Sequence, residues 1–102
     1  MTDPDFAKIE ALRAILQQSS PILGGGSKHA LEHYLDHDEY EMALEGLLID
    51  LLASNHFPAD FPWDQVLALG TEFRLDSEPM FDATAWLRFL AAMDAARRSS
   101  RA

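Results

Sequence analysis

The stretch DEYEMALEGLLIDLL, residues 38–52, decides the fold. Its apolar residues recur every three or four positions, which is the period of one face of an α-helix and not the alternation of a strand. Those residues are Tyr40, Ala43, Leu44, Leu47, Leu48, Leu51 and Leu52. Asp38, with Glu41 three residues later, resembles a capping box in which aspartate replaces the usual serine or threonine. We therefore expect a helix that starts at Asp38 and forms the centre of the hydrophobic core.

The N-terminal third contains two more predicted helices. The first runs from about residue 3 to 18, with Asp3 as its N-cap and Pro4 at the first helical position. The stretch SSPILGGGS then interrupts the helical period, because proline disfavours helix at the preceding residue and glycine is conformationally permissive. The second helix is expected to start at Ser27, a favoured N-cap residue, and to end near Asp36.

Two further helices are predicted in the C-terminal half. The proline-rich run HFPADFP ends the central helix, and a fourth helix is expected to open near residues 60–62. Gly70 weakens the prediction for the last turns of this helix. The run LDSEP is the next break, and a fifth helix is expected to begin at Pro79 or Asp82.

The predicted fold class is all-α, a compact bundle of four to five short helices joined by short loops, because no segment of useful length alternates as a strand does. The 102 residues are enough for one hydrophobic core, so we expect a single domain over residues 1–102. Three arginines fall within the last six residues, RRSSRA, where they suit the negative end of a terminal helix. We expect residues 97–102 to form a frayed basic tail.

The charge of the chain excludes several function classes. Seventeen acidic residues against eight basic ones give a formal charge of −9, and residues 1–96 hold only five of the bases. Direct binding to nucleic acid is therefore disfavoured, since it requires a basic patch. The apolar runs are too short for a membrane span, and the start lacks the features of a signal peptide, so a cytoplasmic location is expected. The absence of cysteine removes disulfides, thiolate metal sites and thiol nucleophiles.

Three histidines follow one another at four-residue intervals, at His29, His33 and His37. This spacing places side chains on one helix face, where two of them can reach the same metal ion. The sequence lacks the HExxH pattern that would strengthen this interpretation, and the prediction is a solvent-exposed histidine face with no metal site. A metal-binding regulator or enzyme that uses this stripe with Asp36 stays open as an alternative.

No catalytic signature accompanies the many carboxylates. The chain contains no GxSxG, no P-loop and no dinucleotide-binding fingerprint, and the GGGS stretch lacks the lysine and strand of a phosphate-binding loop. No carboxylate pair is visibly placed in the apolar setting that acid–base catalysis requires. We therefore expect a protein that is not an enzyme, with no catalytic residues and no cofactor.

The outer face of the central helix is predicted to be an acidic surface with apolar spots. Such a surface suits a basic protein partner, because acids steer the encounter and apolar residues supply desolvated anchors. The expected electrostatic contacts are Asp36, Asp38, Glu39, Glu41, Glu45 and Asp50, and the expected apolar anchors are Tyr34, Met42 and Trp63. Alternatively, the acids form only a solvated face, Met42 and Ile49 pack beneath a neighbouring helix, and Tyr34 belongs to the core.

The stretch HYLDHDEYEMALEGLLIDLL, residues 33–52, resembles small helical immunity proteins of bacterial polymorphic-toxin systems, of the Maf and contact-dependent-inhibition kind. The shared pattern is a short helix, a turn, a DEYExALEgLL-like helix, a proline-broken linker and a terminal helix with aromatic residues. The resemblance implies a cytoplasmic, non-enzymatic protein that binds one cognate toxin domain, commonly a basic nuclease. It also gives the acidic charge a role, which is to imitate the phosphates that such a nuclease binds.

The predicted function is therefore that of an immunity protein, acting as a monomer or weak homodimer, with occlusion of the toxin's active site favoured over binding elsewhere on it. The histidine stripe and the triple glycine have no place in the immunity-protein pattern. Besides the metal-binding alternative, a generic helical adaptor module fits the same composition and helix pattern.

Overall fold

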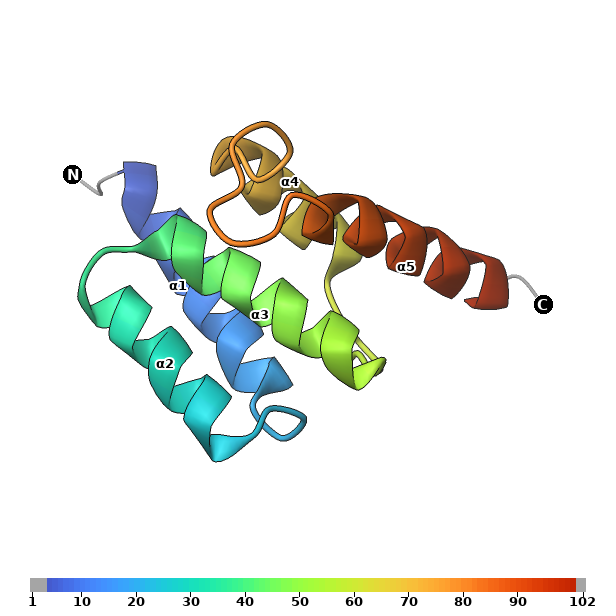
Figure 1. Ribbon diagram of the computed structural model, residues 1–102, viewed down its shortest axis with the longest axis horizontal. Helices are drawn as coiled ribbons and strands as arrows, with labels where there is room; N and C mark the ends of the chain where they lie inside the picture. Colours follow the sequence, from blue (N-terminus) through green and yellow to red (C-terminus); the bar gives the residue numbers. More distant parts are fainter. Residues whose placement is uncertain (1–3, 101–102) are drawn as a thin grey trace.

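The protein is described by a computed structural model of residues 4–100, in which there are five α-helices and no strand (Figure 1). This confirms the predicted all-α fold class. The helices are α1 (Pro4–Ser19), α2 (Gly25–Asp36), α3 (Tyr40–Ser54), α4 (Trp63–Glu72) and α5 (Ala85–Ser100). Among the described residues, no helix has the length and apolar composition needed to cross a bilayer.

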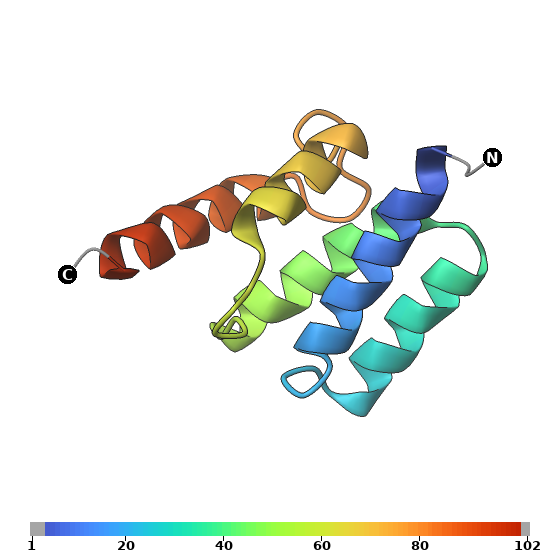
Figure 2. The same ribbon diagram turned by 180° about the vertical axis from the view of Figure 1, so that it is seen from behind.

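Helix α3 is the central element, and the other four helices all contact it. Helices α1 and α2 lie on one side of α3, and α4 and α5 lie on the other, as both views show (Figures 1 and 2). The buried residues of α3 are Ala43, Leu44, Glu45, Leu47, Leu48 and Leu51. Because they spread around more than half of the helix, α3 is covered on several sides and not on one face alone. Its leucines pack with buried residues such as Leu12, Ile15, Val66 and Phe89 in one core.

The predicted N-caps of the second and third helices are wrong. Helix α2 starts at Gly25, two residues before Ser27, so part of the triple glycine is helical. Helix α3 starts at Tyr40, and no side chain caps it. Asp38 instead has a φ of 60°, and its Oδ1 accepts a 2.7 Å hydrogen bond from the Tyr40 hydroxyl. Aspartate tolerates this left-handed conformation, which lets the chain turn from α2 into α3 within three residues.

The ends of the outer helices also differ in part from the prediction. Helix α4 begins at Trp63, directly after the expected residues 60–62, whereas α5 begins only at Ala85. The helical structure of α5 continues to Ser100 and so includes residues 97–100 of the predicted tail, and residues 101–102 lie outside the described part. The predicted N-cap Asp3 also lies outside it.

Candidate partner-binding surface

The burial of Glu45 is the main difference between the predicted surface and the structure. This residue was expected among the exposed electrostatic contacts, but only 2% of it is exposed. The prediction placed the core on the side of Tyr40, Leu44 and Leu47, and Glu45 lies well outside that face. The loop after α4 covers this second side of α3, which the helical period of the sequence does not reveal.

The buried carboxylate of Glu45 holds that loop in place. Its Oε1 accepts a 2.6 Å hydrogen bond from the backbone N–H of Met80, and its Oε2 accepts 2.8 Å bonds from the N–H groups of Phe81 and Asp82. Three consecutive amides thus converge on one anion, in the manner of a backbone nest. These charge-assisted bonds offset the free energy of burying the carboxylate, and they fix residues 80–82 against the middle of α3.

The Glu45 bonds leave two large apolar side chains on the surface. Met80 is 57% exposed and Phe81 is 48% exposed. The Phe81 ring lies beside the half-buried Tyr34 ring, with 6.0 Å between the ring centroids. We call Tyr34, Met80 and Phe81 the apolar patch. Met80 and Phe81 are not predicted by the sequence pattern, in which the available signal is a single glutamate among the leucines of the central helix.

The turn from α2 to α3 gathers four exposed acidic residues, and we call them the acidic corner: Asp36, Asp38, Glu39 and Glu41. None of the four forms an ion pair with another residue of the described part of the chain. The acids that do pair with a lysine or arginine are Glu32, Asp64, Glu72, Glu78, Asp82 and Asp94. The acidic corner is therefore a concentration of negative charge that no ion pair within residues 4–100 neutralises.

The acidic corner and the apolar patch are adjacent. The carbonyl oxygen of Tyr34 accepts a 2.8 Å bond from the N–H of Glu39. Asp36, two residues after Tyr34, lies on another side of α2 and lines the hollow between α1 and α2. Glu41 lies one helical turn before Glu45, which holds the loop of Met80 and Phe81. The structure thus brings the predicted acid Glu39 to the predicted anchor Tyr34, with Asp38 and Glu41 beside Glu39 along the chain, whereas Asp36 faces the α1 side of α2.

The other predicted contact residues, Met42, Asp50 and Trp63, are partly buried, and Trp63 lies away from the acidic corner. Met42 and Asp50 are half-buried on α3. Asp50 lines a shallow groove of about 450 Å³ along the seam of α2 and α3, and Tyr34 and Phe81 line it too. Trp63 lies apart, because it packs against the rings of Phe57, Phe61 and Phe89 and shares a hollow with Leu52 and Asn55 at the far end of α3.

The histidine stripe is exposed, as expected. The rings of His33 and His37 lie 4.2 Å apart between centroids, and Nδ1 of His37 is 2.9 Å from the carbonyl oxygen of His33. Among the described residues, no group of three histidine or carboxylate side chains is placed to hold a metal ion.

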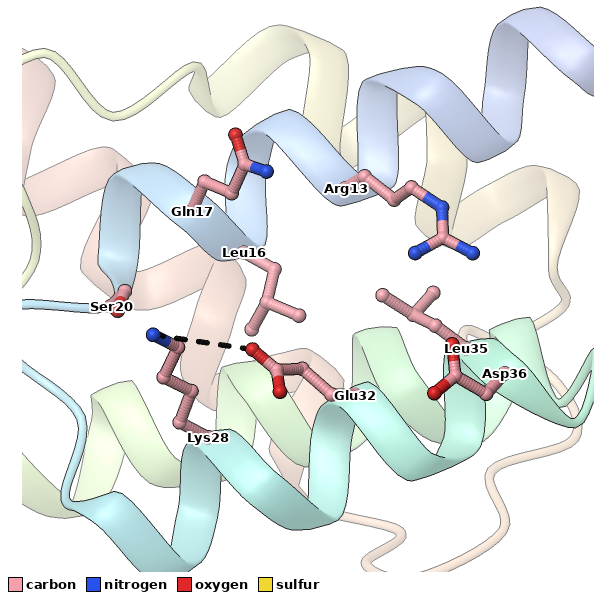
Figure 3. A pocket seen from close by; sticks show the side chains of 8 residues that line it. All are labelled: Arg13, Leu16, Gln17, Ser20, Lys28, Glu32, Leu35 and Asp36. Atoms are coloured by element: carbon pink, nitrogen blue, oxygen red, sulfur yellow. Dashed lines mark ion pairs between the residues drawn. The ribbon is translucent and has the colours of Figure 1, made fainter.

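A second hollow, of about 420 Å³, lies between α1 and α2 (Figure 3). Its floor contains Leu16 and Leu35, and charged side chains of both signs surround it. Lys28 and Glu32 lie one turn apart on α2 and form an ion pair, with 4.0 Å between Nζ and Oε1. Such a mixture is typical of the seam between two packed helices and assigns no chemistry to the hollow.

Asp82 closes the Glu45-held loop and precedes α5. Its Oδ1 accepts hydrogen bonds from the Thr84 hydroxyl at 2.7 Å and the Thr84 N–H at 2.8 Å. These bonds, and then the positive charge of Arg88, hold the pKa of Asp82 below its ordinary value of 3.8. The folded state therefore favours the ionised form, and the resulting stabilisation is present above pH 3.8 and lost as the pH falls through the lower folded-state pKa.

The lowered pKa of Asp82 can be measured by an NMR titration of its carboxyl carbon. The midpoint should fall below 3.8 in the wild-type protein and rise toward that value in Thr84→Ala, which removes the strongest of the stabilising bonds. A wild-type midpoint at or above 3.8 would contradict the hydrogen-bond arrangement at the start of α5.

Comparisons of the chain with protein-family models, with curated proteins and with solved structures gave no significant match. The fold, the acidic corner and the apolar patch are therefore the structural basis for inferring a function.

Proposed function

We propose that this protein is an immunity protein, which binds and neutralises a cognate basic toxin domain, a nuclease, by protein–protein contact. The resemblance of residues 33–52 to helical immunity proteins suggests this class of function. The acidic corner and the apolar patch form the binding surface in this proposal.

The observation that carries the proposal is the position of Met80 and Phe81 next to the acidic corner. Exposed aromatic and methionine side chains are typical anchors of protein interfaces, especially where surrounding groups fix them in place. Here three hydrogen bonds to Glu45 fix the loop, so that little conformational freedom remains to be lost on binding. A surface that contacts only solvent does not need a loop held rigidly with two apolar side chains exposed.

The acidic corner adds the charge that suits a nuclease. A nuclease active site attracts the phosphates of its substrate with basic side chains. Four carboxylates within six residues can occupy such a basic cleft and exclude the nucleic acid. Inhibition by occlusion of the active site is therefore the mechanism that we propose.

We test the proposal by affinity capture from the native host, followed by binding and nuclease assays with the purified captured domain. The wild-type protein should retain one basic domain and inhibit its hydrolysis of nucleic acid. The double variant Glu39→Lys/Glu41→Lys should associate at least about tenfold more slowly and with a weaker dependence on salt, because it reverses charges that steer the encounter.

The matched control is Glu10→Lys/Asp60→Lys, which changes the net charge by the same amount at two exposed acids outside the acidic corner. This variant should associate at nearly the wild-type rate. Equal rates for the two double variants would remove the acidic corner from the binding surface. Failure of the wild-type protein to retain or inhibit any basic domain would overturn the proposal itself.

A further inference from the structure

The groove of about 450 Å³ along the seam of α2 and α3 is lined in its middle by small residues. The two helices lie side by side and run in opposite directions (Figure 1). They approach closely at Gly46, where an added Cβ would lie 2.9 Å from Cδ2 of Leu31. Ser27 and Ala30 continue the lining along α2 with small side chains. Such residues allow the axis of a further helix to come close to the seam.

The two ends of the groove differ in chemistry. Tyr34 and Phe81, both of the apolar patch, line one end. Because α2 and α3 are antiparallel, the other end lies one turn beyond Gly46, where Asp50 and Ser27 line it. Seven positions of α2, or about 10 Å of helix, separate Ser27 from Tyr34. The groove therefore joins an aromatic end to an end that carries a carboxylate.

Asp50 is the one charged residue among those that line this groove within the described part of the chain. It is half-buried, and its side chain forms no ion pair or hydrogen bond with another of residues 4–100. A wholly apolar or an acidic segment laid over it would remove the carboxylate from water without a partner, at a cost in free energy. A segment that fills the groove must therefore bring a cation to Asp50.

We infer that the groove holds an amphipathic helix of the partner, with an apolar side chain against Tyr34 and Phe81 and a lysine or arginine paired with Asp50. This inference rests on the proposed function, in which the partner is a basic toxin domain. The two side chains should be about seven positions apart in the toxin sequence, because seven residues are close to two turns and place both on one face. The groove then extends the binding surface from the apolar patch along the full seam.

Charge favours this occupant over a second copy of the chain. Six of the seven lysines and arginines within residues 4–100 already form ion pairs with acids of their own chain. Two copies, each with a net charge of −9, also repel each other. A basic domain meets no such repulsion and supplies the cation that Asp50 lacks.

The test measures dissociation rates of the full chain from the purified toxin domain that the wild-type protein captures. Asp50→Lys reverses the charge in the groove, and its matched control is Asp60→Lys at an exposed acid elsewhere. Ala30→Trp fills the groove, and its matched control is Ala91→Trp at an exposed position of α5. Circular dichroism verifies that all four variants keep their helices.

We expect Asp50→Lys and Ala30→Trp to dissociate at least about tenfold faster than wild type, and both controls to match wild type. Glutamate in place of one helical lysine or arginine of the toxin, seven positions from an exposed apolar residue, should restore binding to Asp50→Lys. Failure of every such replacement to restore binding would overturn the ion pair assigned to Asp50.

The remaining outcomes separate the groove from the proposed function. If both groove variants matched their controls while the toxin stayed bound, the groove inference would be overturned and the proposed function would stand. If the wild-type protein captured no basic domain, both would be overturned. Sedimentation of the protein alone as a dimer that Ala30→Trp dissociates would assign the groove to a second copy and contradict the inference.

Discussion

Replacing Glu45 by glutamine is expected to lower the free energy of unfolding by about 2–3 kcal/mol, the range for buried hydrogen bonds to a charged group. The carboxylate accepts three backbone N–H bonds with its two oxygens. Glutamine has one acceptor oxygen, so its NH₂ group must face at least one of the three donors. For a domain of this size, the melting temperature should fall by roughly 10–15 °C.

Urea unfolding followed by circular dichroism measures this change, and amide exchange at Met80, Phe81 and Asp82 shows whether the loop is released. The control is Glu41→Gln, an exposed glutamate one turn earlier on the same helix, which should change stability by less than about 0.5 kcal/mol. If Glu45→Gln and Glu41→Gln were equally stable, with unchanged amide exchange, the carboxylate would not be what holds the loop.

The second large effect is expected at Gly70. Gly70→Ala should lower the free energy of unfolding by about 2 kcal/mol, although alanine favours the helix more than glycine does. Gly70 is buried in the last turns of α4, and a Cβ added there would overlap the six-membered ring of Trp86. Trp86 is itself buried, so the overlap can be relieved only by shifting α4 or the indole.

Gly26→Ala is the matched control, since a Cβ at this helical position meets nothing within 4 Å. It should raise the free energy of unfolding by about 0.5 kcal/mol through helix propensity alone. In a double-mutant cycle, Trp86→Phe removes the ring atoms that the new Cβ would meet, so Gly70→Ala should be less destabilising in that background. Additive effects of Gly70→Ala and Trp86→Phe would contradict the close contact.

Local patterns in the sequence predict the helices well, because each helix buries side chains at its own period. The leucines of residues 44–51 identify the central helix and its place in the core. The caps are predicted less well, since Ser27 and Asp38 satisfy the local rule for an N-cap while the tight turn into α3 gives Asp38 a different conformation.

The candidate surface was predictable only in part. Asp36, Asp38, Glu39 and Glu41 lie within a few residues of one another, so their grouping follows from the sequence. The bonds from Glu45 to residues 80–82 span 35 to 37 positions along the chain, and no helical period contains them. For this reason the helical pattern predicts Glu45 on the surface and does not predict the positions of Met80 and Phe81.

The exposed apolar residues of the loop provide the most direct test of the proposed binding surface. Phe81→Ser removes a large apolar side chain of the apolar patch that is 48% exposed. Leu87→Ser is the matched control, because it removes a large apolar side chain of α5 that is 67% exposed. Both variants are used with wild type as baits for capture from the native host, and dissociation rates are then measured with the purified captured domain. Phe81→Ser should release this domain at least about tenfold faster, as expected for an interface anchor, and Leu87→Ser should match wild type. Equal dissociation rates for Phe81→Ser and wild type would contradict the role of the apolar patch in binding.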